Sequence, residues 1–148
     1  MVHSYAKDLL RQVTGAEPTV DPDGDLRFVL SGGTYFLRVM GDRKPIVRVF
    51  SIAAETECSV EVLQLVNEMN SHLVFARAFW VDGQIVIESD HGGLSMDEAD
   101  LVNLCGSVAR ATDEIAPILR ERFGQLMLFE EQKQEDYRQP GPDMPGYL

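Results

Sequence analysis

Residues 74–89, VFARAFWVDGQIVIES, predict a β-hairpin and therefore a sheet in the second half of the chain. Two apolar runs, Val74 to Val81 and Gln84 to Ser89, meet at the pair Asp82-Gly83. An Asp-Gly pair between two such runs is typical of a type I′ turn, because both central positions of that turn require a positive φ. We expect two antiparallel strands joined by a two-residue loop.

A helix is expected immediately before this hairpin. It is indicated by apolar residues at alternating spacings of four and three, namely Val62, Val66, Met69 and Leu73. Ser59 is placed to cap its N-terminus. Asn67 and Asn70 lie on its polar face, where we expect them to be solvated and to help end the helix.

The longest helix is expected after the hairpin. Ser95 and Glu98 have the spacing of a capping box, which predicts where this helix begins. Apolar residues then recur at helical spacing as far as Phe123, and Gly124 is placed to end the helix. The breadth of this apolar stripe predicts that the helix buries a wide face.

The first half of the chain predicts one more helix, Ser4 to Thr14, and three more strands. The strands are expected at Leu26 to Leu30, Thr34 to Met40 and Ile46 to Ile52, separated by turns rich in Gly, Asp and Pro. The complete order is α-β-β-β-α-β-β-α. We therefore predict an α+β fold with a single antiparallel five-stranded sheet backed by helices.

The alternation of side chains along each strand divides this sheet into two faces. The core face takes Leu26, Phe28, Leu30, Tyr35, Leu37, Val39, Val47, Val49, Ala76, Ala78, Trp80, Ile85 and Ile87. The opposite face carries four arginines and four phenylalanines, which we predict to bind a partner: Arg27, Phe36, Arg38, Arg48, Phe50, Phe75, Arg77 and Phe79. Arginine and aromatic residues are enriched at protein interfaces, whereas lysine is depleted. The alternatives are that the arginine stems only cover a half-exposed sheet, that a second copy binds there, or that the acidic tail does.

Composition and charge indicate the number of domains and disfavour some classes of partner. The 148 residues predict one domain, residues 1–124, followed by an acidic Pro/Gly-rich tail, residues 125–148. A net charge of -11 disfavours nucleic acid and anionic membranes as partners. No signal peptide or membrane span is recognisable, so a cytoplasmic location is expected, and Cys58 and Cys105 are expected to be reduced thiols.

Catalytic, metal and cofactor motifs are not recognisable in the sequence. Asp21, Asp23 and Asp25 resemble the start of a calcium loop, but Gly32 stands where such a loop needs a bidentate glutamate, so we expect a turn without a metal at Asp21 to Asp25. The three histidines lie in separate segments, and no serine has a GxSxG context. We therefore expect no enzyme activity, no metal and no cofactor.

Two longer runs resemble a known family. Residues 62–90, VLQLVNEMNSHLVFARAFWVDGQIVIESD, and residues 94–124, LSMDEADLVNLCGSVARATDEIAPILRERFG, resemble the YbjN-like family, which is related in fold to the type III secretion chaperones. The resemblance implies the same order of helices and strands and a non-enzymatic, chaperone-like or peptide-binding role, often as a dimer.

The sequence therefore favours a protein that binds another polypeptide, with acidic partner segments preferred. Two rival hypotheses stay open. In the first, a stable homodimer buries the arginine and aromatic face. In the second, the protein binds a small molecule in a pocket between the sheet and the long helix.

Overall fold

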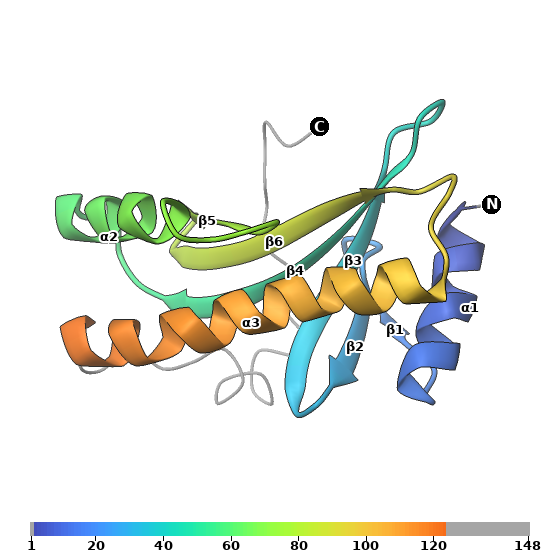
Figure 1. Ribbon diagram of the computed structural model, residues 1–148, viewed down its shortest axis with the longest axis horizontal. Helices are drawn as coiled ribbons and strands as arrows, with labels where there is room; N and C mark the ends of the chain where they lie inside the picture. Colours follow the sequence, from blue (N-terminus) through green and yellow to red (C-terminus); the bar gives the residue numbers. More distant parts are fainter. Residues whose placement is uncertain (1, 124–148) are drawn as a thin grey trace.

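The computed structural model describes residues 2–123 and contains an antiparallel sheet with helices on one side (Figure 1). The helices are α1 (Val2–Thr14), α2 (Val60–Asn70) and α3 (Glu98–Phe123). The strands are β1 (Thr19–Val20), β2 (Leu26–Leu30), β3 (Gly33–Met40), β4 (Ile46–Glu55), β5 (Arg77–Val81) and β6 (Gln84–Gly92). The predicted α+β fold is confirmed, and the predicted tail lies outside the described residues.

The sheet has six strands, so the predicted count of five is wrong. The strand order is β1-β2-β3-β4-β6-β5, and every neighbouring pair is antiparallel. The missed strand, β1, has only two residues, which pair as Thr19↔Arg27 and Val20↔Leu26. Both β1 residues are exposed, so their sequence has no apolar alternation from which a strand could be predicted.

The Asp82-Gly83 turn is confirmed. Asp82 has φ 47° and Gly83 has φ 82°, and Val81 pairs with Gln84 across the turn. The predicted start of the first hairpin strand at Val74 is wrong, because β5 begins at Arg77. Phe75 has φ 60°, a left-handed conformation that interrupts an extended strand.

Other boundaries also differ from the prediction, mainly because long-range pairing extends the strands. β4 continues to Glu55 through a register shift near Ile52, and β6 continues to Gly92, because these two strands pair along their whole lengths. Helix α1 begins at Val2, two residues before the predicted start at Ser4.

The long helix α3 also begins differently from the prediction. Asp97 N–H donates to the Asp100 carboxylate, and Asp100 N–H donates to the Asp97 carboxylate. This reciprocal pair is a capping box made by Asp97 and Asp100, so the predicted box of Ser95 and Glu98 is wrong. The N-cap of α2 is confirmed, since the Ser59 side chain accepts from Val62 N–H at 3.1 Å.

All three helices pack on one face of the sheet, which we call the inner face. Figure 1 shows α3 running the length of the molecule across this face, with α1 at one end and α2 at the other. The main core joins all three helices to the predicted core face of the strands, with Leu30, Val39, Ala76 and Trp80 only partly buried. The predicted division of the sheet into two faces is therefore confirmed, except for Phe75, which precedes β5. No helix of residues 2–123 is both long enough and apolar enough to cross a membrane.

Asn70 is exposed and is the last residue of α2, as expected, but its side chain has a further role. Its side-chain amide donates to Ala78 C=O at 2.8 Å and its side-chain oxygen accepts from Ala78 N–H at 2.8 Å. Ala78 is buried, so these two bonds supply partners that its backbone groups need. Asn70 therefore joins the end of α2 to β5.

Candidate functional site

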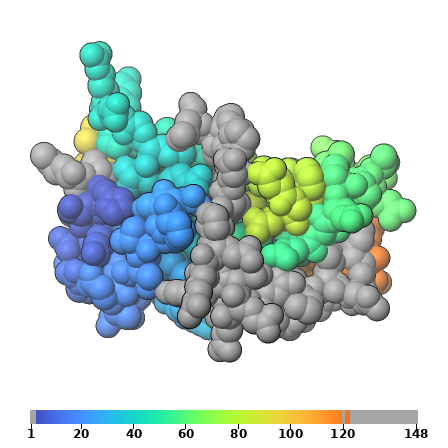
Figure 2. All heavy atoms as spheres, turned by 180° about the vertical axis from the view of Figure 1, so that it is seen from behind, coloured from blue at the N-terminus to red at the C-terminus, as the bar shows by residue number. Residues whose placement is uncertain are grey.

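The opposite side of the sheet, which we call the outer face, carries seven of the eight predicted partner-binding residues. Figure 2 views the molecule from this side, where strands from both halves of the chain are visible. Cross-strand pairing aligns five outer-face residues in one row: Arg27↔Phe36, Phe36↔Phe50, Phe50↔Glu88 and Glu88↔Arg77. This row crosses β2, β3, β4, β6 and β5, with two phenylalanines in the middle and an arginine at each end.

The middle of the outer face is an apolar cluster. It consists of Phe36, Phe50, Ile52 and Val86, with Phe79 and Val81 packed against it, and we call it the outer cluster. The rings of Phe36 and Phe50 stack with centroids 5.2 Å apart and planes 16° from parallel. Phe50 has no exposed surface. This face thus has a hydrophobic centre of its own, separate from the main core.

Two arginine guanidiniums lie against these rings. The guanidinium carbon of Arg38 is 5.3 Å from the centroid of the Phe50 ring, and that of Arg77 is 6.0 Å from the Phe79 ring. A guanidinium at this distance is attracted by the negative face of an aromatic ring. The arginines and phenylalanines therefore form one mixed surface in which apolar and charged groups are in contact.

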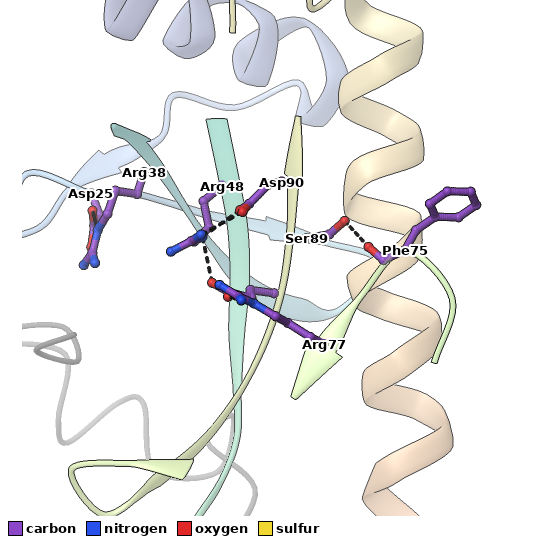
Figure 3. A network of polar contacts seen from close by, with 8 residues as sticks. Asp25, Arg38, Arg48, Phe75, Arg77, Ser89 and Asp90 are labelled. Carbon is purple, nitrogen blue, oxygen red and sulfur yellow. Dashed lines mark hydrogen bonds and ion pairs between the residues drawn. The ribbon is translucent and has the colours of Figure 1, made fainter. Parts of the chain in front are cut away.

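Carboxylates of the same chain hold three of the arginines. Arg38 donates to both oxygens of Asp25 at 2.8 and 2.7 Å, and Arg48 donates to both oxygens of Asp90 at 2.6 and 2.7 Å (Figure 3). Glu88 lies between Arg48 and Arg77 and forms an ion pair with each. Arg27 also has an interaction partner.

The register explains why these carboxylates are needed. Arg38 and Arg48 are directly opposite each other on β3 and β4, and like charges in that position repel. Arg48 is also buried, with 5% of its surface exposed, so it requires a paired opposite charge. Asp25 and Asp90 provide one counter-charge for each arginine.

Glu88 has an unusual electrostatic environment for a carboxylate. It is 1% exposed, and its burial raises its pKa to about 7, although Arg48 and Arg77 act to lower it. Its Oε2 atom lies 2.7 Å from Arg48 Nε but accepts no hydrogen bond from residues 2–123. A buried carboxylate therefore lies at the centre of the outer face, between two arginines.

Asp25 and Asp90 were missed by the sequence analysis. The sequence predicts a turn at Asp25, and Asp90 is one residue beyond the predicted end of its strand at Ser89. A signal was available, because continuing the strand alternation from Glu88 places Asp90 on the arginine face.

Phe75 is the one predicted partner-binding residue that is not on the outer face. It is 83% exposed and lies in the loop between α2 and β5, where its carbonyl accepts a hydrogen bond from the Ser89 hydroxyl. Because β5 begins only at Arg77, residues 89–92 of β6 pair with β4 and have no other strand beside them within residues 2–123. Hollows on either side of Phe75, of about 300 and 380 Å³, flank this open edge of β6.

Two further hollows lie beside α3. A groove of about 290 Å³ separates α2 from the second half of α3. Another, of about 440 Å³, lies between α3 and the β3 and β4 strands, where the small-molecule hypothesis places its pocket. Among the residues that line it, the Ser51 and Thr112 hydroxyls hydrogen-bond to each other at 2.9 Å, and Thr112 also donates to Val108 C=O.

The aspartates at 21, 23 and 25 are held by the turn in which they lie. Their carboxylates are within 4.8 Å of one another. The Asp21 side chain accepts from the backbone N–H groups of Asp23 and Asp25, each at 2.9 Å, and Asp25 also binds Arg38. These contacts are those of a side-chain-stabilised turn, the structure expected for this segment.

The fold resembles those of three complexes of known structure, one of which contains a type III secretion chaperone. The ExsC-ExsE complex matches with a TM-score of 0.58 and 9% identity, over 79% of this chain and 95% of the other. The Yersinia pestis type III secretion chaperone SycH, in complex with a fragment of YscM2, matches with a TM-score of 0.53 and 10% identity, over 76% and 98%. The HopA1-SchA chaperone-effector complex matches with a TM-score of 0.51 and 10% identity, over 78% and 94%. At these identities the likeness establishes the fold alone.

A family match covers most of the chain. Residues 1–130 match the family described as TY-Chap1, T3SS (YopN, CesT) and YbjN peptide-binding chaperone 1. No curated protein matches the sequence. The resemblance found in the sequence is confirmed, and the chain belongs to the TY-Chap1 family of type III secretion and YbjN peptide-binding chaperones.

Proposed function

We propose that this protein binds a segment of another polypeptide on its outer face and catalyses no reaction there. The observation that carries this proposal is the row from Arg27 through Phe36, Phe50 and Glu88 to Arg77. Because the row crosses five strands, an extended segment that lies along it can contact charged and apolar side chains in turn. We call the bound segment the client.

Acidic and aromatic clients suit this face best. Each guanidinium has five N–H donors, and the bidentate pair between Arg38 and Asp25 uses two of them. Asp25, Glu88 and Asp90 hold the arginines in fixed positions, which lowers the entropy lost when a client carboxylate binds. The outer cluster supplies the apolar contact between the charged ends of the row.

The open edge of β6 could extend this site. An extended client can add backbone hydrogen bonds at an unpaired strand edge, and exposed aromatic side chains beside the edge add apolar contact. Residues 89–92 of β6 and the exposed ring of Phe75 provide these two elements. In this proposal Phe75 contacts the client at the end of the site and not on the outer face itself.

Two synthetic peptides can test the proposal. One would alternate glutamate and phenylalanine over about twelve residues, and the other would have lysine in place of each glutamate. Fluorescence anisotropy with the full chain should detect binding of the acidic peptide only. Reversing the charge of Arg77, which lies at the exposed end of the row, should weaken this binding about tenfold, or about 1.4 kcal/mol.

Arg43 provides the matched control. It is exposed in the turn between β3 and β4, so Arg43→Glu changes the net charge by the same amount away from the row. Equal losses for Arg77→Glu and Arg43→Glu, or equal binding of both peptides, would show that the row does not form the site. Mass measurement by light scattering addresses the homodimer alternative, since a tight dimer that binds neither peptide would replace the proposal.

A further inference from the structure

The outer cluster is more deeply buried than an open sheet face allows. Phe50 and Val86 have no exposed surface, and Phe36 and Ile52 are each 5% exposed. Among residues 2–123, only strand residues make up this cluster, while the helices pack on the inner face. A sheet face that is open to water is normally polar. The burial and apolar composition of this face indicate a covered surface.

We propose that residues 124–148 of the same chain cover the outer face when no client is bound, and that a client displaces them. The covering rests on the burial and chemistry of the outer face. The displacement also rests on the proposed function, because it requires the client to use the same face.

The length of this segment is sufficient. Helix α3 ends at Phe123, so 25 residues follow it. Twenty-five residues can span roughly 80 Å when extended. Six strands are about 24 Å wide, at about 4.8 Å between neighbours. The segment can therefore pass around the edge of the sheet and cross the outer face.

The chemistry of the segment complements the outer face. Its first part, Leu126 to Phe129, is apolar and suits the outer cluster. The remainder contains five acidic residues, Glu130, Glu131, Glu135, Asp136 and Asp143, and only two basic residues. The outer face holds four of the chain's 13 lysines and arginines, so it can pair with these carboxylates.

The groove between α2 and α3 is a weaker alternative for the same segment. It lies close to the end of α3 and has apolar walls. However, Glu68, Glu114 and Glu121 line it, with Arg122 and His72. Carboxylates outnumber arginines in this groove, whereas the four arginines of the outer face outnumber its three carboxylates, Asp25, Glu88 and Asp90.

A tethered occupant of this kind would weaken client binding by a predictable factor. A short flexible tether gives an effective concentration on the order of 1 mM. If the segment binds the face with an intrinsic Kd of about 100 µM, it lowers the apparent client affinity about tenfold. Only a client with enough carboxylate and aromatic contacts would then displace it.

A nitroxide spin label on the full chain can locate the segment. The label would be attached at Gln132→Cys, with the exposed Cys58 changed to Ser and the buried Cys105 retained. We expect the amide signals of Arg38 and Phe79 to lose most of their intensity, and to regain it when the label is reduced. Signals of the α2–α3 groove, such as Glu68, should be much less affected.

Two results would overturn the covering. One is signal loss centred on the α2–α3 groove, or uniformly small losses. The other comes from a mixture of two kinds of chain, one isotope-labelled without the nitroxide and the other unlabelled with it. If the isotope-labelled chains lose as much signal in this mixture as in the singly labelled protein, the occupant is a second copy. Either result leaves the peptide-binding test of the proposed function unaffected.

Displacement has its own test in the full chain. Reversing Glu130 and Glu131 to lysine should raise affinity for the glutamate-phenylalanine peptide about tenfold. The control reverses Glu57 and Glu61, which are exposed at the start of α2. Equal changes in both double variants would overturn the displacement. If the label reports covering but the peptide never binds, the covering stands and the proposed function fails.

Discussion

Replacing Phe50 with alanine tests whether the outer face is a second core or an open surface. Phe50 has no exposed surface, stacks on Phe36 and lies under the Arg38 guanidinium. Alanine would remove the ring and leave a cavity among strand residues that the helices do not cover. Phe75→Ala is the matched control, because that ring is 83% exposed.

The expected magnitude follows from burial. Truncating a fully buried phenylalanine costs about 3–5 kcal/mol, as lost transfer free energy and cavity formation. An exposed side chain changes the free energy of unfolding by about 0.5 kcal/mol or less. With a urea m-value of about 1–3 kcal/mol per molar, a loss of 4 kcal/mol lowers the unfolding midpoint by at least about 1.3 M.

Urea unfolding followed by tryptophan fluorescence is a suitable assay. Trp80 is the only tryptophan, and its indole N–H donates to Thr56 C=O at 2.8 Å, so its environment depends on the fold. Circular dichroism should give the same midpoint if unfolding is two-state. A loss below about 1 kcal/mol for Phe50→Ala, or equal losses for Phe50→Ala and Phe75→Ala, would refute the reasoning about this face.

Three further predictions concern stability. Asn70→Ala should lower the free energy of unfolding in urea by about 2 kcal/mol, since Ala78 loses two buried hydrogen-bond partners. The control, Asn67→Ala, should cost less than about 0.5 kcal/mol. Equal losses would contradict the role of Asn70 in joining α2 to β5. Burial raises the pKa of Glu88 from 4.5 to about 7. The contribution of protonated Glu88 to the free energy of unfolding is therefore fully present below pH 4.5 and is lost as the pH rises through 7. That loss of stability is at most about 3 kcal/mol. Glu88→Gln should remove this pH dependence from urea midpoints measured between about pH 4.5 and 8. A variant with the same pH profile as the original protein would argue against the raised pKa. Gly83→Ala should cost about 1 kcal/mol in thermal unfolding because its φ is +82°, although a Cβ there meets no atom within 4 Å; an unchanged melting temperature would contradict the strain.

Much of the fold follows from local sequence patterns. The Asp82-Gly83 turn, the Ser59 cap and the core face of the strands all depend on neighbouring residues, and the structure confirms each. The boundaries that were wrong depend on contacts between distant residues. β6 continues beyond Ser89 because β4 lies beside it, and β1 exists because β2 offers it a partner.

Part of the candidate site could likewise be predicted from local patterns, and part of it depends on contacts between distant residues. Alternation along single strands placed Arg27, Phe36, Phe50 and Arg77 on one face, and this required no knowledge of strand order. Their use in binding a partner stays a prediction. The left-handed backbone at Phe75 could not be read from an apolar run, and it removed this residue from the outer face.

The sequence by itself determined the fold class, the family resemblance and which side chains share a face, because turn chemistry and period-two alternation are local properties. Only the tertiary structure decided that Arg38 and Arg48 are neighbours, each held by its own carboxylate, and that Phe50 has no exposed surface. These facts depend on register and on which strands lie side by side. Both are set by packing between segments that are far apart in the chain.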